Sequence, residues 1–416
     1  MAGEDRVVIS GMGAVTPLAM TAGGTWTALT EGRSGVGPIT AFDASDYPTR
    51  IAAEVKDFEP ASKMSVKAVK RSSRTSQLAV TAAHEAVEDA GLSCSFADEE
   101  AAVFVNSAVS GFAEIEEAAG VRDAGGIRRI SPHFVSSALT NMAACEIAIS
   151  LGVHGPVNAS ALACASGAYA LLEARRALLA FDADYVIAGG VDAAITPAMF
   201  GGLSAMRALS TNNDAPAEAS RPFDADRDGF VFGEGAVIFV LERLSQARAR
   251  GAGIYAEVRG GALTSDSFHT VAPEPSGTYA AAAIRRGLRN ARLDPADIDY
   301  VCAHGTSTKL NDRTETSAIR QGLGSAADSV AVSAPKSMTG HLIGAAGALA
   351  GLVCARSIAE NVITPTINYR TADPDCDLDY VPNEARQGRV DHAITNAFGF
   401  GGQNCVVAFG GVEASG

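Results

Sequence analysis

The stretch ALACASGAYALLEARR, residues 161–176, places one cysteine, Cys164, among small residues directly before a helical pattern. We expect a buried helix whose first turn lies beside the thiol. One interpretation of Cys164 is a small apolar core residue. The other is a nucleophile, because a helix N-terminus offers free N–H groups and a partial positive charge that lower a thiol's pKa and stabilise an oxyanion. A nucleophilic cysteine needs a histidine from elsewhere in the chain, so the positions of the histidines decide between the two interpretations.

The composition is that of a globular protein, with 47% apolar and 19% charged residues in a chain long enough for one large core or two domains. The net charge of −14 disfavours a nucleic-acid partner. The N-terminus lacks a basic segment followed by an apolar one, and no uninterrupted apolar run reaches membrane-spanning length. We therefore expect a cytoplasmic protein without a membrane span.

The seven cysteines are scattered and form no C-x-x-C pair, which argues against a disulfide framework and against a metal site. The stretch GMGAV, residues 11–15, lacks the third glycine and the acidic residue of a dinucleotide-binding loop. No phosphate-binding G-x-x-x-x-G-K-[ST] sequence occurs either. These patterns exclude a nucleotide cofactor.

Apolar runs and helical patterns alternate along both halves of the chain, which predicts a mixed α/β architecture built from two copies of one unit. We expect strands at residues 7–10, 102–105, 185–188, 236–242, 254–264, 300–304, 393–398 and 404–410. We expect the main helices at residues 75–90, 141–150, 280–291 and 346–359. The N-terminal half, 1–252, carries the cysteine, and the C-terminal half, 253–416, carries the histidine segments described next. No low-complexity linker separates them, so they are expected to pack as one body.

Two small-residue stretches carry histidine: VCAHGTSTKLND, with His304, and SAPKSMTGHLIGAAGALA, with Lys336 and His341. A lone histidine at a strand end is more often structural. Two of them, with a nearby lysine and one suitably placed cysteine, favour a site. A thiolate can hold an acyl group as a thioester, while two neutral imidazoles can stabilise the enolate that forms when a malonyl thioester loses carbon dioxide. The enolate would then attack the acyl group.

Over residues 7–410 the chain resembles the elongating, Cys-His-His type of β-ketoacyl-acyl carrier protein synthase. The shared motifs are the Cys164 segment, AHGTSTKLND, KSMTGHLIGAAGA, RPFDADRDGFVFGEGA and NAFGFGGQN. The resemblance implies a thiolase-like fold, a duplicated layered α-β-α-β-α architecture, and an acyltransferase that needs no cofactor because substrates arrive on the phosphopantetheine of a carrier protein. NDRTET, residues 311–316, resembles the catalytic ketosynthase subunit of bacterial type II polyketide synthases, whereas NAFGFGG resembles the fatty-acid enzymes. Both pathways stay open.

The resemblance also implies residue roles. It makes Cys164 the nucleophile, His304 and His341 the enolate-stabilising pair, and Lys336 a charged partner that orders the site. It implies an oxyanion hole formed by the backbone N–H groups of Cys164 and Phe400, and Phe400 matches a gating phenylalanine. The remaining matches are the phosphopantetheine-binding Thr306 and Thr308, the acidic Asp312 and Glu315 of the lysine network, and Asp266 and His269 in a mobile loop near the pocket.

Three features depart from the family pattern. Ala350 replaces the usual glutamate, which removes a carboxylate near Lys336. This departure argues against the structural cation site of the family. Cys302 stands where asparagine is frequent. The segment VNSAVSG, residues 105–111, replaces a more Gly-rich segment that borders the acyl pocket.

Five basic residues, Lys63, Lys67, Lys70, Arg71 and Arg74, would form one stripe if their segment were helical. A solvated helix face is the plain interpretation. The other is a dock for an acidic acyl carrier protein. The resemblance places carrier docking at Lys67, Lys70 and Arg71, with Arg128, Arg129 and Arg207 nearby. It also implies a homodimer, or a heterodimer with a homologous chain-length factor.

Three rival functions are weighed against the synthase. A degradative thiolase shares the fold and the nucleophile but has an Asn-containing motif in place of that around His304. It also needs a second catalytic cysteine, and Cys405 follows GGQN, which is the wrong context. A non-catalytic chain-length subunit lacks the nucleophile that Cys164 supplies. An acyl-binding protein with an inactive site is suggested only by Ala350.

Overall fold

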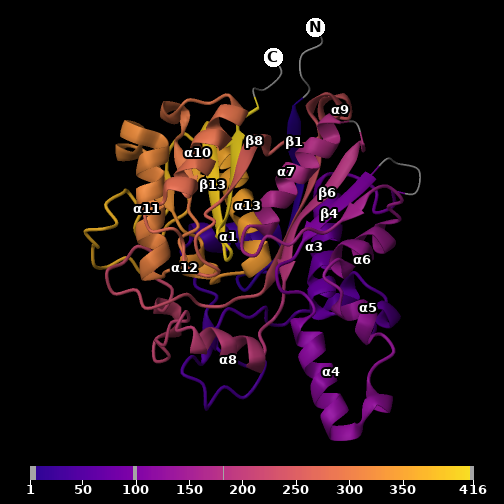
Figure 1. Ribbon diagram of the computed structural model, residues 1–416. Helices are drawn as coiled ribbons and strands as arrows, with labels where there is room; N and C mark the ends of the chain where they lie inside the picture. Colours follow the sequence, from indigo (N-terminus) through magenta and orange to yellow (C-terminus); the bar gives the residue numbers. More distant parts are fainter. Residues whose placement is uncertain (1–5, 97–100, 181, 413–416) are drawn as a thin grey trace.

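The structure is a computed structural model that describes residues 6–96, 101–180 and 182–412 (Figure 1). Its main sheet has the strand order β10-β9-β13-β14-β8-β1-β7-β6-β4-β5. The strands of the first half are β1 (Val7–Val15), β4 (Ala101–Asn106), β5 (Val157–Asn158), β6 (Tyr185–Asp192) and β7 (Gly235–Arg243). Those of the second half are β8 (Ala256–Ser265), β9 (Tyr300–Cys302), β10 (Ala331–Ser333), β13 (His392–Gly399) and β14 (Gln403–Gly410).

The two halves repeat one topology. In each half the first strand pairs antiparallel with the last, and the last pairs antiparallel with the fourth. The fourth then pairs parallel with the second, and the second parallel with the third. The halves meet at a short antiparallel contact between β1 and β8. This is the duplicated α/β architecture that the sequence predicts.

The division between residues 252 and 253 falls in the connection from α9 (Leu244–Ala249) to β8, where one set of strands ends and the next begins. The boundary itself stays a prediction. Residues 1–5 and 413–416 of the expected halves lie outside the described residues.

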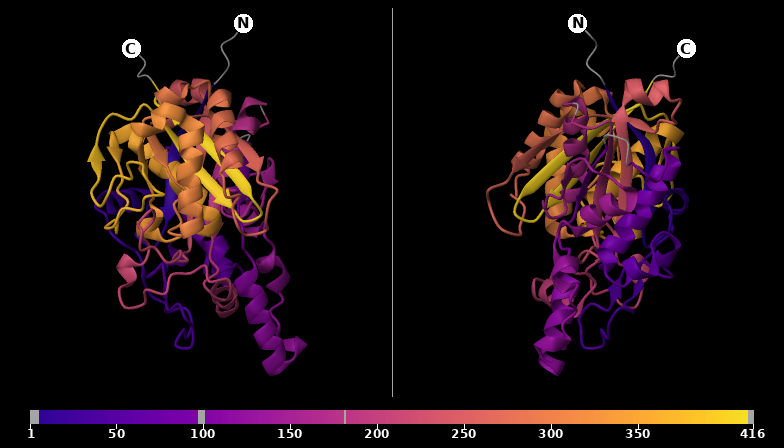
Figure 2. Two further views of the ribbon diagram at one scale, coloured as in Figure 1. Left: turned by 60° about the vertical axis from the view of Figure 1, so that its left-hand side comes forward. Right: turned by 90° about the vertical axis from the view of Figure 1, so that its right-hand side faces the viewer.

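Helices cover both outer faces and fill the space between the halves (Figures 1 and 2). On the first half α3 (Arg74–Asp89) packs on β1 and β7, and α6 (Met142–Leu151) on β4. On the second half α10 (Thr278–Ala291) packs on β8 and β14 and is backed by α11 (Lys309–Leu323). Between the halves, α7 (Ser166–Leu179) contacts β6 and β14, and α13 (Ala346–Glu360) contacts β13 and α7. The result is five layers, α-β-α-β-α.

The two central helices approach closely because small residues line their contact. A Cβ atom at Gly167 of α7 would lie only 2.6 Å from the carbonyl oxygen of Gly344, and one at Gly347 of α13 would lie 2.6 Å from the amide nitrogen of Ala168. Only glycine fits at such distances. The start of α7, which follows Cys164, is thereby held against the turn that follows His341.

Most predicted strands and helices are present, with ends shifted by a few residues. The largest difference is β1, which we expect to end at residue 10 and which continues to Val15. The glycines that suggest a strand end are used for packing, since a Cβ at Gly13 would lie 1.9 Å from the carbonyl oxygen of Ala82 in α3. Elements that the sequence analysis did not single out include α4 (Phe112–Gly125), α5 (Phe134–Ala138), α8 (Pro197–Ala205), and α12 (Lys336–Thr339).

The segment Ile343–Glu360, formed by η6 (Ile343–Ala345) and α13, is long and apolar enough to cross a membrane by length and composition. Arg356 and Ser357 interrupt it, so it does not contradict the expectation that no uninterrupted apolar run reaches that length. Most of the segment is buried inside the fold, between the two halves of the main sheet. A helix that is apolar all round is what a central layer requires.

Two further helices belong to the first half of the chain. The first, α1 (Ala22–Thr30), packs beside β1. The second, α2 (Val66–Val69), is a single turn in the basic segment. Short two-stranded pairings complete the described fold: β2 (Gly37–Pro38) with β3 (Ile51–Ala52), and β11 (Val362–Ile363) with β12 (Arg386–Gln387).

Candidate active site

Cys164 lies in a tight turn directly before α7. Ala163 has a φ of 47°, in the left-handed region that non-glycine residues rarely adopt. The hydroxyl of Ser166 holds this turn, because it accepts from the backbone N–H of Leu162 at 2.9 Å and donates to the carbonyl of Ala163 at 2.7 Å. The cysteine is buried, and its side chain faces the cavity described below.

Burial raises the pKa of the Cys164 thiol to about 11. The charge of Lys336 and the backbone N–H groups of Phe400 and of Cys164 itself act in the opposite direction but do not outweigh burial. The backbone N–H groups therefore lower this pKa as expected, but in the free protein burial outweighs them. The two N–H groups do converge on the sulfur, which is the arrangement needed to bind an oxyanion formed there.

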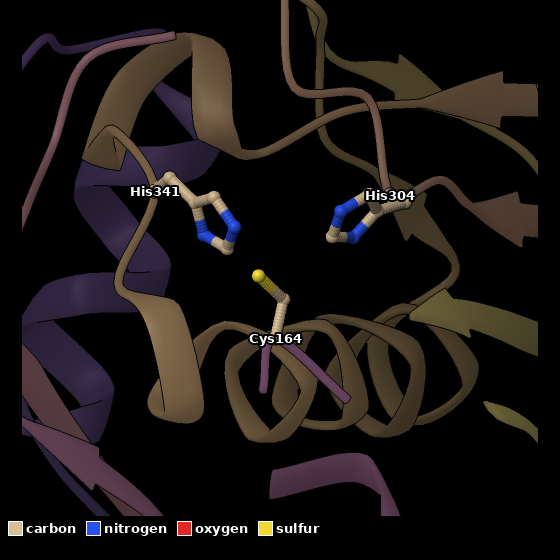
Figure 3. Close-up of side chains that lie close together, drawn as sticks. All are labelled: Cys164, His304 and His341. Carbon is tan, nitrogen blue, oxygen red and sulfur yellow. The ribbon is translucent and has the colours of Figure 1, made fainter. Parts of the chain in front are cut away.

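His304 and His341 approach Cys164 from two different loops of the second half (Figure 3). His304 follows β9, and His341 follows α12. Their ring centroids are 5.4 Å apart, the ring planes are nearly perpendicular at 86°, and their ring nitrogens and the Cys164 sulfur come within 4.8 Å of one another. Burial, reinforced by the charge of Lys336, holds both histidine pKa values well below 6.5. Both rings are neutral at physiological pH.

The tautomers of the two rings follow from their hydrogen-bond partners. The backbone N–H of Ile343 donates to Nδ1 of His341 at 3.1 Å, and the ammonium of Lys336 lies 3.4 Å from Nδ1 of His304. A donor at Nδ1 places the ring proton on Nε2. Among the described residues, Nε2 of His341 has no hydrogen-bond partner although it is buried. Both rings thus direct an N–H donor into the site.

Cys164, His304 and His341 are also a ligand set that zinc would accept. Metal-binding imidazoles need an acceptor behind them, so that the proton leaves the ligating nitrogen. Here both rings have a donor behind them. The arrangement therefore fits stabilisation of a carbonyl oxygen and does not fit a metal centre.

A second group with metal-ligand spacing, His84, Glu88 and Cys94, lies near the surface. The ammonium of Lys63 pairs with Glu88 at 2.5 Å and already neutralises its carboxylate. His84 is hydrogen-bonded to Ser150. These contacts account for the polar groups of the cluster without an ion.

Lys336 is buried beside His304 and donates to its carbonyl oxygen. Burial lowers the pKa of Lys336, and the charge of Glu315 opposes this effect. Glu315 holds the same loop from the other side, accepting from the N–H groups of His304 and Gly305 at 2.7 Å. No carboxylate among the described residues forms an ion pair with Lys336, which agrees with the alanine at position 350.

Asp312 is buried near this network but pairs with a different cation. Its carboxylate lies 3.3 Å from the guanidinium of Arg227 and accepts from the N–H of Phe223. Arg227 is itself buried and donates to the carbonyl oxygens of Thr308 and Lys309. Sequence reasoning missed Arg227, although an arginine among the aspartates of RPFDADRDGF is a signal for a buried ion pair.

A cavity of about 660 Å³ surrounds the three residues Cys164, His304 and His341. Its polar lining includes five further predicted site residues: Thr306, Thr308, Asp266, His269 and Arg207. Phe400 also lines it and leaves 41% of its surface exposed. The apolar lining comes largely from the first half and includes Ala108, Val109, Phe112, Met199, Leu203, Phe230 and Ile343. Such a cavity suits a substrate with one polar and one apolar arm.

The predicted loop residues have distinct contacts at the cavity. The carboxylate of Asp266 accepts from Asn404 at 2.6 Å, and its N–H donates to the carbonyl of Gly402 at 2.9 Å. These bonds tie its loop to the turn that carries Phe400. His269 is exposed, and its Nδ1 accepts from two backbone N–H groups of its own loop. The hydroxyls of Thr306 and Thr308 lie 2.9 Å apart.

The basic segment is not one helix, so the condition for a single stripe of five basic residues is not met. The short α2 ends at Val69, and Ser73 caps the separate helix α3. Two of the five basic residues are held in ion pairs, Lys63 with Glu88 and Arg74 with Glu234.

The other three residues of the segment, Lys67, Lys70 and Arg71, are exposed and form no ion pair among the described residues. Arg128 and Arg129 are exposed on η2 (Ile127–Arg129), which follows the projecting helix α4 (Figure 2). Arg207 lies at the cavity instead.

Comparisons with known proteins agree over nearly the whole chain. Residues 4–247 match the N-terminal domain of β-ketoacyl synthase, and residues 255–370 match its C-terminal domain. The 3-oxoacyl-[acyl-carrier-protein] synthase 2 of Synechocystis sp. is 45% identical over 98% of both chains. That of Coxiella burnetii is 44% identical over 96% of this chain and 97% of its own.

Solved structures agree with the sequence matches. The ishigamide ketosynthase/chain length factor superposes with a TM-score of 0.93 at 35% identity, covering 99% of this chain and all of its own. A type II polyketide synthase acyl-carrier protein in complex with its ketosynthase, AntDE:AntF, contains a chain with a TM-score of 0.90 at 31% identity, covering 98% of this chain and all of its own. The fold is thiolase-like, and the chain belongs to the β-ketoacyl synthase family of acyltransferases.

Proposed function

We propose that the protein extends an acyl chain by decarboxylative condensation with a malonyl carrier protein, in fatty-acid or polyketide elongation. The observation that carries this proposal is the convergence of one thiol and two Nε2–H donors in one cavity. A non-catalytic subunit would not need this arrangement, and a degradative thiolase would need a second cysteine in the site. Among the described residues, Cys164 is the only cysteine that lines the cavity.

In the first half-reaction the sulfur of Cys164 attacks the carbonyl carbon of the acyl thioester. The oxyanion of the tetrahedral intermediate accepts hydrogen bonds from the backbone N–H groups of Cys164 and Phe400. The carbon–sulfur bond to the carrier then breaks, and the carrier thiol leaves with the proton that Cys164 gives up. The step is neutral overall, so a resting thiol with a raised pKa is compatible with it.

In the second half-reaction the malonyl thioester oxygen accepts from Nε2–H of His304 and of His341. These bonds stabilise the enolate that remains when carbon dioxide leaves. The enolate carbon attacks the acyl group on Cys164, a carbon–carbon bond forms, and the cysteine leaves as a thiolate. The thiolate takes up one proton from solvent water, as its raised pKa favours. Lys336 and Glu315 position His304 through their bonds to its backbone.

The decisive experiment separates condensation from decarboxylation. The Cys164→Ala variant is expected to lose condensation completely, because no other thiol lines the cavity to hold the acyl group. The Cys164→Gln variant is expected to keep malonyl decarboxylation, because a side-chain amide mimics the acylated cysteine. Cys94→Ala, which removes a thiol outside the cavity, is the control and should behave as the wild type. Condensation by Cys164→Ala at a near wild-type rate would contradict the assignment, and no acylation of the wild type would favour an inactive acyl-binding site.

We infer that the substrate-delivering partner is an acyl carrier protein, the kind of partner present in the AntDE:AntF complex, and that the surface of this partner is acidic. The exposed and unpaired Lys67, Lys70 and Arg71 supply the positive charge, and Arg207 supplies it at the cavity. Arg128 and Arg129 are the further predicted docking residues. A local basic surface on a chain of net charge −14 supports this proposal, since rim charges steer association.

We also infer a dimer, formed by a second copy or by a homologous chain-length factor. Helices α4 and α5 contain no buried residue and expose Phe112, Ile115 and Val135. The strand β5 ends the sheet, and both of its residues are exposed. Exposed apolar side chains on one element and a free strand edge on another each favour a partner subunit. The cytoplasmic location expected from the sequence stays a prediction.

A further inference from the structure

We propose that Asp192 is a positioning residue that holds one wall of the acyl cavity and the turn behind His341 in a single geometry. This inference rests on the proposed function. Asp192 ends β6, is fully buried, and lies outside every motif that the sequence analysis selected. Its carboxylate joins two segments that are far apart in the chain.

The first segment is the loop after β4. Oδ1 of Asp192 accepts from the hydroxyl of Ser107 at 2.5 Å and from the N–H of Val109 at 3.0 Å, and Oδ2 accepts from the N–H of Ala108 at 3.0 Å. The Ser107 hydroxyl in turn accepts from the N–H of Ser110 at 3.0 Å. Ala108 and Val109 line the cavity, so these bonds set the position of its wall.

The second segment is the turn after His341. Oδ2 of Asp192 accepts from the N–H of Gly344 at 2.6 Å. The preceding residue, Ile343, has a φ of 50°, a conformation that strains a β-branched residue. Its own N–H makes the 3.1 Å bond to Nδ1 of His341 that sets the tautomer of that ring. The bond from Gly344 to Asp192 therefore helps to hold the strained residue on which the His341 donor depends.

A carboxylate is the group that this position requires. Four donors converge on its two oxygens, and an ionised carboxyl group offers acceptors only. An asparagine of the same shape would turn an NH₂ group toward donors on one side. Burial raises the pKa of Asp192 to about 6, so the group is ionised at pH 7.5. The carboxylate also needs glycine at position 344, because a Cβ atom there would lie only 2.4 Å from Oδ2 of Asp192.

The test compares Asp192→Asn with Ser107→Ala in the full-length protein at pH 7.5. Two readouts are needed: the decarboxylation rate with malonyl carrier protein, and the ratio of kcat/KM for loading decanoyl and butyryl groups onto Cys164. Asp192→Asn disturbs both segments, so we expect decarboxylation to fall about tenfold and the ratio to fall with it. Ser107→Ala disturbs only the wall, so the ratio should fall about threefold while decarboxylation changes less than about twofold.

Circular dichroism and thermal melting establish that each variant is folded. A folded Asp192→Asn variant with wild-type values of both readouts would overturn the inference. So would a Ser107→Ala variant that slows decarboxylation as much as loading, because the two segments would then not be separable. If Asp192→Asn does not fold, the loading ratio of Ser107→Ala decides. Failure of the wild type to decarboxylate malonyl groups would instead count against the proposed function.

Discussion

At the scale of single residues, the site depends on burial and on donors more than on charge. The buried thiol of Cys164 has a raised pKa, and the two buried imidazoles have lowered ones, so all three groups are neutral at rest. Neutral groups lose less on burial than ions do. In the proposed reaction, negative charge develops first on the substrate, as an oxyanion or an enolate, where fixed N–H groups stabilise it, and it passes to the sulfur of Cys164 only when the cysteine leaves.

This arrangement predicts a flat pH dependence for the enolate-forming step. Protonation of His304 and His341 is displaced to a pH well below 6.5, because burial and Lys336 disfavour the imidazolium. Decarboxylation by the Cys164→Gln variant should therefore change less than about twofold between pH 8 and pH 6.5. The measurement is carbon dioxide release from malonyl carrier protein. A loss of about fourfold, which is what two ordinary histidines of pKa 6.5 would produce, would contradict it.

At the scale of elements, the basic segment shows what a spacing pattern can predict. The intervals between Lys63 and Arg74 fit a helix face, but Ser73 caps α3 and interrupts the helix. Capping residues at helix starts are strong local signals, and they take precedence over charge spacing. The docking surface therefore reduces to the loop and short helix that present Lys67, Lys70 and Arg71.

We expect the Lys67→Glu/Lys70→Glu variant to use carrier-bound substrates several-fold less well, because it replaces attraction by repulsion at a surface with few competing cations. The loss should appear as a higher KM for carrier-bound substrates, and this increase in KM should be larger at low salt. An N-acetylcysteamine thioester should react almost normally, since it never contacts the segment. The measurement is steady-state kinetics with both substrates.

The matched control for that variant is Arg286→Glu/Arg289→Glu, the same charge change at exposed positions of α10. It should leave the KM for carrier-bound substrates near the wild-type value. An equal loss with both substrates in the Lys67/Lys70 variant would show that the segment supports the fold and that the carrier docks elsewhere.

At the scale of the whole molecule, the site exists only because two halves are packed together. Cys164 comes from the first half, and His304, His341 and Lys336 come from the second. The central helices α7 and α13 bring the parts to one point, and their close contact leaves no room for larger side chains at Gly167 or Gly347. Neither half alone holds Cys164, His304 and His341 together.

The exposed apolar side chains of α4 and α5 lead to a prediction about the proposed dimer. Ile115→Glu/Val135→Glu places two charges on the exposed apolar surface of α4 and α5, so the dimer should dissociate and activity should fall with it. Light scattering coupled to gel filtration measures the mass, and the Arg286→Glu/Arg289→Glu variant is again the control. A fully active monomeric wild type would contradict the proposed dimer, and a mass that doubles only with a homologous partner would identify a heterodimer.

The sequence by itself determined most of the strands and helices and the duplicated α/β class, and it selected Cys164, His304 and His341 as the candidate site residues. These rest on periodicity and on contiguous motifs, such as the one around Cys164, in which the informative residues are neighbours in the chain. Sequence motifs are also sufficient to associate Thr306, Thr308 and Glu315 with the same site, where the structure indeed places them.

Only the tertiary structure decided which partner each buried group has. Asp312 pairs with Arg227, Arg74 with Glu234, and the pKa of Cys164 rises where a helix N-terminus alone would lower it. The hydrogen bond from Gly344 to Asp192 spans 152 residues. Desolvation and long-range pairing depend on which surfaces come into contact when the layers pack. A local sequence pattern cannot predict these contacts, because the residues involved are far apart in the chain.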